Sequence, residues 1–193
     1  SLVSSSRAKT KRLFAAYPYH MWNQKMNAES YGFDSVYAED VSDRMVADRV
    51  ISSIRHDSTP FICTMVTMAS HSPFMLYADS SSLQINLSPY DAAQTRYLQC
   101  VHYTDSAIGR VIDRVLTDSV LAATTRIVIT GDHPFFSLES PVPFILYDPF
   151  CVPCTVTRPL YQIDIYSTLV ERMHIATPWH GLGKNISDSC AYH

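Results

Sequence analysis

Hydrophobic and polar positions along the chain predict helices that alternate with short apolar strands. Some segments repeat apolar residues with the period of a helix, whereas others are short and apolar on both faces, which is typical of strands in a parallel sheet. The expected helices cover residues 41–56, 89–116 and 163–174, and the expected strands cover residues 60–67, 126–130 and 142–147. This alternation predicts an α/β fold with a mostly parallel sheet and helices on both of its faces.

Polar residues mark the ends of the expected helices. Ser42 or Asp43 is placed to cap the first helix, and Pro89 suits the first turn of the second. Asp164 lies near the start of the last helix, where the helix dipole favours an anion. On the long second helix we expect Tyr103 to pack in the core and Asp105 to be a buried partner of a cation.

Length, composition and charge restrict the class of protein. The chain has 193 residues, of which 47% are hydrophobic and 17% charged, so we expect one folded domain over residues 1–193 with flexible ends at 1–12 and 188–193. The formal net charge of -3, without a basic stripe, argues against a nucleic-acid partner. The longest apolar runs are too short to cross a bilayer.

The five cysteines are too few to indicate a disulfide scaffold. Cys63 and Cys100 lie in apolar, periodic segments, where buried thiols are expected. Cys151 and Cys154 form a C-x-x-C pair, interpreted as a local disulfide or two reduced thiols. A small zinc-binding module at this pair is a weaker alternative, because nineteen residues separate Cys154 from the next histidine, His174.

Two polar clusters follow the first and second expected strands. The first is "MASHSPF", which contains His71, and the second is Gly131-Asp132-His133. In open α/β sheets, ligands bind beyond the carboxyl ends of the strands. We therefore expect His71, Asp132 and His133 along one rim of the sheet.

The residue types in these clusters suit a metal and an anion. Asp132 and His133 offer an oxygen and an imidazole ligand to Zn²⁺ or Mn²⁺, and Gly131 permits a close approach; the alternative is a capping Asp beside a surface His. His71 could donate to a phosphate or sulfate oxygen or protonate a leaving alcohol, or it could be a loop histidine bonded to the backbone.

An aromatic and polar segment near the N-terminus, "YPYHMWNQ", is a further candidate for the site. His20, Trp22 and Asn23 could form an aromatic wall with polar groups, or they could pack together in a surface loop. From the residue types alone both interpretations stay open.

Taken together and in order, these segments resemble the lipoteichoic-acid-synthase-like branch of the sulfatases, within the alkaline phosphatase superfamily. The resemblance runs from about Tyr17 to Ile186. The matching segments are "MWNQKMNAESYGFDSVY", "FICTMVTMASHSPF", "YLQCVHYTDSAIGRVIDRVL", "IVITGDH", "VPFILYDP" and "YQIDIYSTLVERMHIATPWHGLGKNI".

The resemblance implies an extracytoplasmic α/β domain that handles phosphate or sulfate esters of an anionic glycan or a lipid-linked substrate. In well-known members of the branch a divalent ion, often Mn²⁺, activates a threonine that takes up a phosphoglycerol group. The resemblance therefore implies a divalent metal for this chain, with Mn²⁺ expected and Zn²⁺, Mg²⁺ or Ca²⁺ as alternatives. By carry-over, Asp132 and His133 are metal ligands, and His71 and Trp22 contact the phosphoglycerol head.

The sequence departs from the branch in two places of the binding segment. Gln24 stands where the branch has Arg, which removes a fixed positive charge. The histidine that the branch has upstream of the tryptophan falls on Ala15, so His20 takes its role only with a rearranged loop. The resemblance therefore supports the general ester class more strongly than phosphoglycerol.

The nucleophile and the acidic metal ligand of the family precede the segment that matches here. The sequence is thus interpreted as the C-terminal part of a sulfatase or phosphoglycerol transferase, incomplete at its N-terminus, inactive as this chain alone, and membrane-associated only through the missing part. The alternative is a degenerate, non-catalytic domain of the same fold that binds an anionic glycan or a protein partner.

Overall fold

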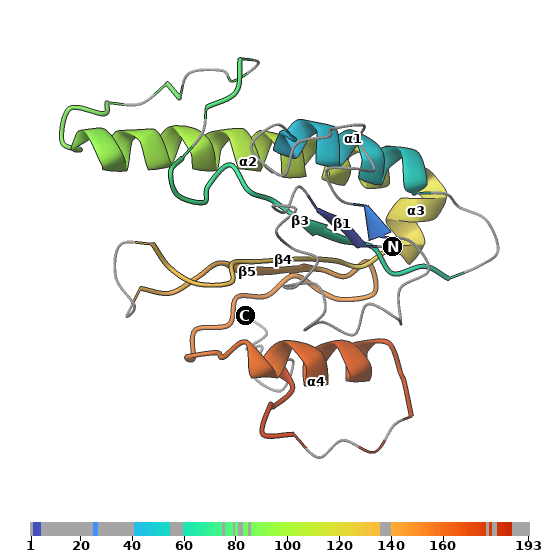
Figure 1. Ribbon diagram of the computed structural model, residues 1–193. Helices are drawn as coiled ribbons and strands as arrows, with labels where there is room; N and C mark the ends of the chain where they lie inside the picture. The colour runs from blue at the N-terminus through green and yellow to red at the C-terminus, as the bar shows by residue number, and fades with distance from the viewer. Residues whose placement is uncertain are drawn as a thin grey trace. The chain divides into compact units, whose positions relative to one another are not determined.

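The computed structural model shows two compact units, Ser1–Pro149 and Phe150–His193 (Figure 1). The structure describes residues 2–4, 25–26, 41–54, 60–74, 76–78, 80, 83–84, 86–135, 140–176, 178 and 181–186.

The strands of the first unit form two small sheets. Strands β1 (Leu2–Ser4), β2 (Lys25–Met26) and β3 (Thr64–Val66) form a parallel sheet in the order β2-β1-β3. Strands β4 (Ile127–Thr130) and β5 (Phe144–Tyr147) pair with each other. The α/β class is confirmed, whereas the apolar pattern predicts neither β1 nor β2.

The pairing of β4 with β5 is antiparallel, with Ile127 opposite Tyr147 and Thr130 opposite Phe144. This differs from the mostly parallel arrangement predicted from the sequence. Parallel neighbours need a crossover connection, which usually contains a helix. Between β4 and β5, the described residues 131–135 and 140–143 contain no helix, and the chain returns in the opposite direction.

Helix α1 (Asp43–Ser53) begins where the sequence predicts, because the Ser42 side chain accepts a hydrogen bond from the Met45 N–H at 3.3 Å. Helix α1 packs along α2 (Ala92–Leu116) and against strands β1 and β3, as Figure 1 shows. The residues on its buried face follow the helical period and are Asp43, Val46, Ala47 and Val50.

Helix α2 begins later than predicted. Asp91 and Gln94 form a capping box, in which Asp91 accepts the Gln94 N–H at 2.8 Å and Gln94 accepts the Asp91 N–H at 3.1 Å. Pro89 therefore precedes the cap instead of occupying the first turn. Tyr103 is buried as expected, but Asp105 is exposed, so its predicted burial beside a cation is wrong.

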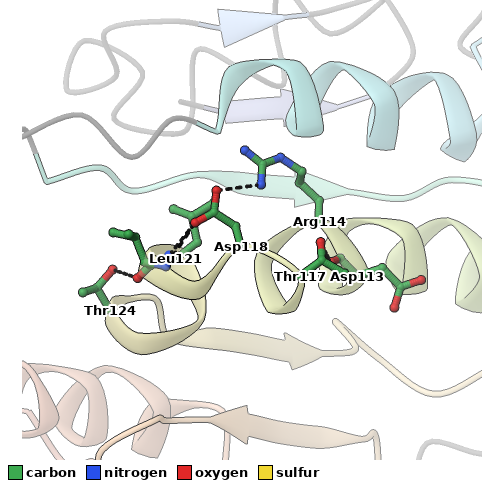
Figure 2. A network of polar contacts seen from close by, with 7 residues as sticks. Asp113, Arg114, Thr117, Asp118, Leu121 and Thr124 are labelled. Carbon is green, nitrogen blue, oxygen red and sulfur yellow. Dashed lines mark hydrogen bonds and ion pairs between the residues drawn. The ribbon is translucent and has the colours of Figure 1, made fainter.

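A short helix, α3 (Ser119–Thr124), follows α2 and was not predicted (Figure 2). Asp118 caps it by accepting the N–H groups of Val120 and Leu121 at 3.1 and 3.2 Å. Arg114, one turn upstream, donates to the same carboxylate at 3.2 Å. These contacts fix the turn between the two helices and bury Leu121.

The core of the first unit contains two clusters of buried side chains. The larger cluster joins α1, the end of α2 and α3 and comprises Val41, Val46, Val50, Ile54, Val115 and Leu121, with Cys63, Met65, Val111 and Ile127 packed against it. The smaller contains Ala69, Phe74, Cys100 and Tyr103. Both expected buried thiols pack in these clusters, and burial raises the pKa of Cys100 to about 11.

The second unit is built around α4 (Ile163–Arg172), and Asp164 lies in its first turn as predicted. This buried carboxylate accepts the Tyr161 N–H at 3.0 Å and the Lys184 N–H at 2.8 Å. Thr168, one turn further, accepts the Ile186 N–H at 2.9 Å. Two helical side chains therefore hold the C-terminal segment 184–186 onto α4.

We expect the stability of the second unit to depend on the ionisation of Asp164. The hydrogen bonds from Lys184 and Tyr161 lower its pKa below the ordinary 3.8. The stabilisation is therefore complete above the ordinary value and is lost as the pH falls through the lower value of the folded state. Urea unfolding monitored by amide exchange of α4, at about pH 7 and about pH 3, should show this loss in the wild type. The Asp164→Asn variant should be less stable at neutral pH and lack this pH dependence; an unchanged profile would contradict the assignment.

The C-x-x-C pair is neither a local disulfide nor a zinc module. Cys154 is disulfide-bonded, whereas Cys151 carries a reduced thiol in contact with the Arg172 guanidinium. The two sulfurs are therefore not bonded to each other, and a sulfur in a disulfide cannot ligate zinc as a thiolate. The alternative of a zinc-binding module at this pair is wrong.

Among the helices that the structure describes, none is long and apolar enough to cross a membrane.

Candidate metal and anion site

His71 lies in a chain of tight turns that follows β3. The His71 N–H donates to the Met68 carbonyl at 2.9 Å, and the Phe74 N–H donates to the His71 carbonyl at 2.8 Å. The His71 ring is exposed, and its Nδ1 lies 2.6 Å from the Ser72 carbonyl oxygen. Because a carbonyl only accepts, the proton of the neutral ring is on Nδ1. His71 is thus a loop histidine that bonds the backbone through one nitrogen and has an exposed ring; its role toward an anion stays a prediction.

Asp132 and His133 directly follow β4 and are strongly exposed, with 89% and 65% of their side chains accessible. Asp132 Oδ1 accepts the His133 backbone N–H at 2.9 Å, which turns the carboxylate toward the imidazole. His133 Nε2 then lies 3.7 Å from Asp132 Oδ2. On the other side of the ring, Nδ1 lies 3.0 Å from the Pro134 carbonyl oxygen.

This arrangement fits a shared divalent cation. Metal-binding histidines commonly donate one ring N–H to a backbone carbonyl and ligate through the other nitrogen, which the Pro134 contact permits for Nε2. Two ligand bonds of about 2.1 Å each span at most about 4.2 Å, so the separation of 3.7 Å between Nε2 and Oδ2 lies within reach. The exposed fractions leave room for further ligands.

Gly131 permits a close approach, as the sequence indicates. What approaches it is the protein's own chain at Val142 and Pro143, whereas the sequence predicts a bound metal there. A Cβ at this position would lie 3.1 Å from Val142 Cβ and 3.6 Å from Pro143 Cδ. The absence of a side chain lets the end of β4 pack against the residues that lead into β5. The backbone of Asp132 and His133 is thereby held at the edge of the two-stranded sheet.

Aromatic packing connects the two polar clusters. Phe74, at the end of the His71 turn, lies edge-on to Phe135 with ring centroids 4.7 Å apart. Tyr97 of α2 stacks on Phe135 at 5.0 Å and meets Phe74 edge-on at 5.5 Å. Because β3 and β4 belong to different sheets, this triad, and not a continuous sheet, brings the His71 loop beside the Asp132-His133 turn.

A buried acid that the sequence did not identify as functional supports the His71 loop. Asp43 Oδ1 accepts the Met68 N–H at 2.7 Å, and its two oxygens lie 3.3 Å from the Ala69 nitrogen. Thr104 of α2 donates to Oδ2 at 2.7 Å. Burial raises the pKa of Asp43 even though these hydrogen bonds oppose the shift.

The remaining candidates, His20, Trp22 and Gln24, lie outside the described residues. Within the described part of the chain, no group of three or more His, Cys, Asp or Glu side chains is close enough to hold a metal. Asp132 and His133 are a pair of neighbouring side chains there, not part of a larger group.

Comparison with known proteins identifies a family. The family model described as "Sulfatase" matches residues 6–175, which include every candidate residue discussed above. Searches of the curated proteins and of the solved structures returned no significant match.

Proposed function

We propose, because the chain belongs to the sulfatase family, that it works in a metal-dependent transferase or hydrolase of phosphoric or sulfuric esters. Members of this family act on sulfate or phosphate esters and generally bind a divalent metal. The observation that carries the proposal is the facing pair of Asp132 Oδ2 and His133 Nε2, 3.7 Å apart on exposed side chains.

Asp132 and His133 would hold the cation. Asp132 contributes a negative oxygen, and the Pro134 carbonyl keeps the His133 proton on Nδ1, which leaves Nε2 for the metal. When bound, a divalent cation supplies positive charge that stabilises the ester anion. Carboxylate and imidazole together suit Mn²⁺ or Zn²⁺, and we propose Mn²⁺ on the resemblance to the phosphoglycerol-transferring branch.

His71 would bind the anionic group of the substrate. Its ring is exposed and lies in a loop that packs beside the Asp132-His133 turn through Phe74 and Phe135. A protonated imidazole donates a charge-assisted hydrogen bond to a phosphate or sulfate oxygen, or a proton to the leaving alcohol.

The phosphoglycerol-transferase type is the more specific form of the proposal. It is supported by the order of the motifs, and it assigns substrate contacts to Trp22, His20 and Gln24. The substrate would be an anionic glycan or a lipid-linked ester. Neutral Gln24 in place of Arg would bind the anionic head more weakly, because it lacks a fixed charge and a bidentate donor.

An extracytoplasmic location is part of the same proposal. The disulfide at Cys154 supports it, since structural disulfides form and persist chiefly in oxidising compartments. Membrane association would come from a segment outside these residues.

The direct test is ester cleavage by the longest natural polypeptide that contains these residues. The test would use a phosphodiester, a phosphomonoester and a sulfate ester, each with Mn²⁺ and with a chelator. We expect turnover of at least one ester that the chelator abolishes. Among the described residues no three or more His, Cys, Asp or Glu side chains group together, which favours a second candidate, a non-catalytic domain that binds an anionic glycan or protein. Absence of turnover on all three esters would reject the enzyme in favour of that candidate.

We predict that His71→Ala lowers kcat for this ester by about 10²–10⁴-fold, the range for loss of a positioned proton donor. Its metal content should stay at the wild-type level, because His71 is not one of the two ligands. His174→Asn is the matched control, since His174 is an exposed histidine at φ 52, a conformation that Asn tolerates. Wild-type turnover in His71→Ala would make His71 a loop residue only.

A further inference from the structure

A buried side chain of α1 binds the backbone at the point where the His71 loop leaves β3. Asp43 belongs to the first turn of α1, yet it does not cap that helix, because Ser42 does. Its carboxylate instead receives the N–H groups of Met68 and Ala69, the residues at which the loop leaves β3. The next turn begins at the Met68 carbonyl, which accepts the His71 N–H at 2.9 Å.

The carboxylate is itself held from the opposite side. Thr104 on α2 donates its hydroxyl to Asp43 Oδ2 at 2.7 Å, from a position that is also buried. The donors therefore come from α2 and from the loop, whereas the acceptor comes from α1. All these donors point at an acceptor-only group. A neutral amide in its place would offer the Met68 and Ala69 N–H groups an uncharged acceptor and would reverse the hydrogen bond with Thr104, so the hydrogen bonds to the loop would be weaker.

This buried acid is costly for the fold, which indicates a specific role. An apolar residue would pack on α1 without desolvating a charge, as Val46 and Val50 do on the same face. Because hydrogen bonds to a charged group are shorter and stronger than neutral ones, they fix the backbone of Met68 and Ala69 more firmly. His71 lies two residues after Ala69 in the chain.

We propose that Asp43, held by Thr104, is the positioning residue that sets the backbone of the loop that presents His71. Its effect on turnover rests on the proposed function; its effect on the loop does not. Asp43 would not touch the ester. It acts through the Met68 and Ala69 amides, and a displacement of about 1 Å at a reacting group can cost about 10²-fold in rate.

The test compares Asp43→Asn with Asp48→Asn. Asp48 lies on the same helix, is exposed and pairs with Arg110, so the control makes the same chemical change away from the loop. In the 193-residue chain, we expect Asp43→Asn to speed amide exchange at Met68 and Ala69 by about tenfold, because a hydrogen bond to a charged acceptor is stronger than one to a neutral acceptor. The His71 imidazole resonances should shift as well. The control should change neither.

The turnover arm uses the longest natural polypeptide that contains these residues. There Asp43→Asn should lower kcat by about 10–100-fold with KM nearly unchanged, while the metal content stays at the wild-type level. An unshifted His71 resonance with wild-type exchange would overturn the proposal, and so would a shifted loop with unchanged kcat. If the wild type turns over no ester but the loop still shifts, the proposed function fails and the effect of Asp43 on the loop stands.

A second variant covers the case in which Asp43→Asn does not fold. Thr104→Val keeps the Asp43 carboxylate and the hydrogen bonds that it accepts from the backbone. The substitution replaces the Thr104 hydroxyl, one of the donors, with a methyl group of similar size. We expect faster exchange at Met68 and Ala69 and a smaller shift of the His71 resonance. Exchange as slow as in the wild type would overturn the proposal.

Discussion

Asp132→Asn is expected to lower the affinity for Mn²⁺ by more than about 100-fold, since even the loss of an outer-shell partner costs about 10–100-fold. The charged oxygen Oδ2, 3.7 Å from His133 Nε2, would become part of a neutral amide. Asparagine can still accept the His133 N–H, so the turn should persist and the change in affinity should report the ligand alone. Titration calorimetry of the folded protein with Mn²⁺ measures this affinity.

His133→Ala should weaken binding in the same way, because it removes the imidazole nitrogen that faces the carboxylate. Asp105→Asn is the control: Asp105 is another exposed aspartate of the same unit, on α2, and loses the same charge. If Asp132→Asn bound Mn²⁺ as tightly as this control, Asp132 would not be a ligand.

Gly183→Ala should destabilise the second unit by at least about 3 kcal/mol, the upper part of the usual cost of overpacking. A Cβ at Gly183 would lie 2.1 Å from the Ile163 carbonyl oxygen and 2.8 Å from its carbon. These are backbone atoms at the first residue of α4, so no side-chain rotation relieves the clash. The segment that Asp164 holds through Lys184 would have to leave the helix. Amide exchange of α4 should then approach that of an unfolded peptide.

Gly109→Ala is the matched control, because it adds the same methyl group to a glycine inside α2. No atom lies within 4 Å of the added Cβ there. Alanine in a helix interior is more favourable than glycine by about 0.5–1 kcal/mol, so this variant should be slightly more stable. Slow α4 exchange in Gly183→Ala would contradict the close contact with Ile163.

The helical elements could be predicted from the sequence because their signals are local. The apolar stripe of α1 and the Ser42 cap depend only on neighbouring residues, and so does the position of Asp164 in α4. Strand direction depends instead on what connects two strands in space. The apolar runs of β4 and β5 are compatible with either direction, and the pattern therefore did not predict the antiparallel pair.

The candidate site likewise contains residues that local sequence signals indicate and a residue whose role is visible only in the fold. Asp132, His133 and His71 stood out because polar residues directly follow apolar strands. Asp43 was assigned as a possible cap, although it lies in register with Val46, Ala47 and Val50 on the apolar face. An acid in step with an apolar stripe is the signal that could have identified it. Its partners, more than twenty positions away at Met68 and Ala69, are visible only in the fold.

The central claim is that Asp132 and His133 bind one divalent cation beside the loop of His71. Pulsed electron paramagnetic resonance of protein-bound Mn²⁺ tests it most directly, because a ligating imidazole nitrogen modulates the signal. We predict nitrogen modulation in the wild type and in His71→Ala, and its loss in His133→Ala at saturating Mn²⁺. The same modulation in His133→Ala as in the wild type would show that Mn²⁺ binds elsewhere and would contradict the assignment.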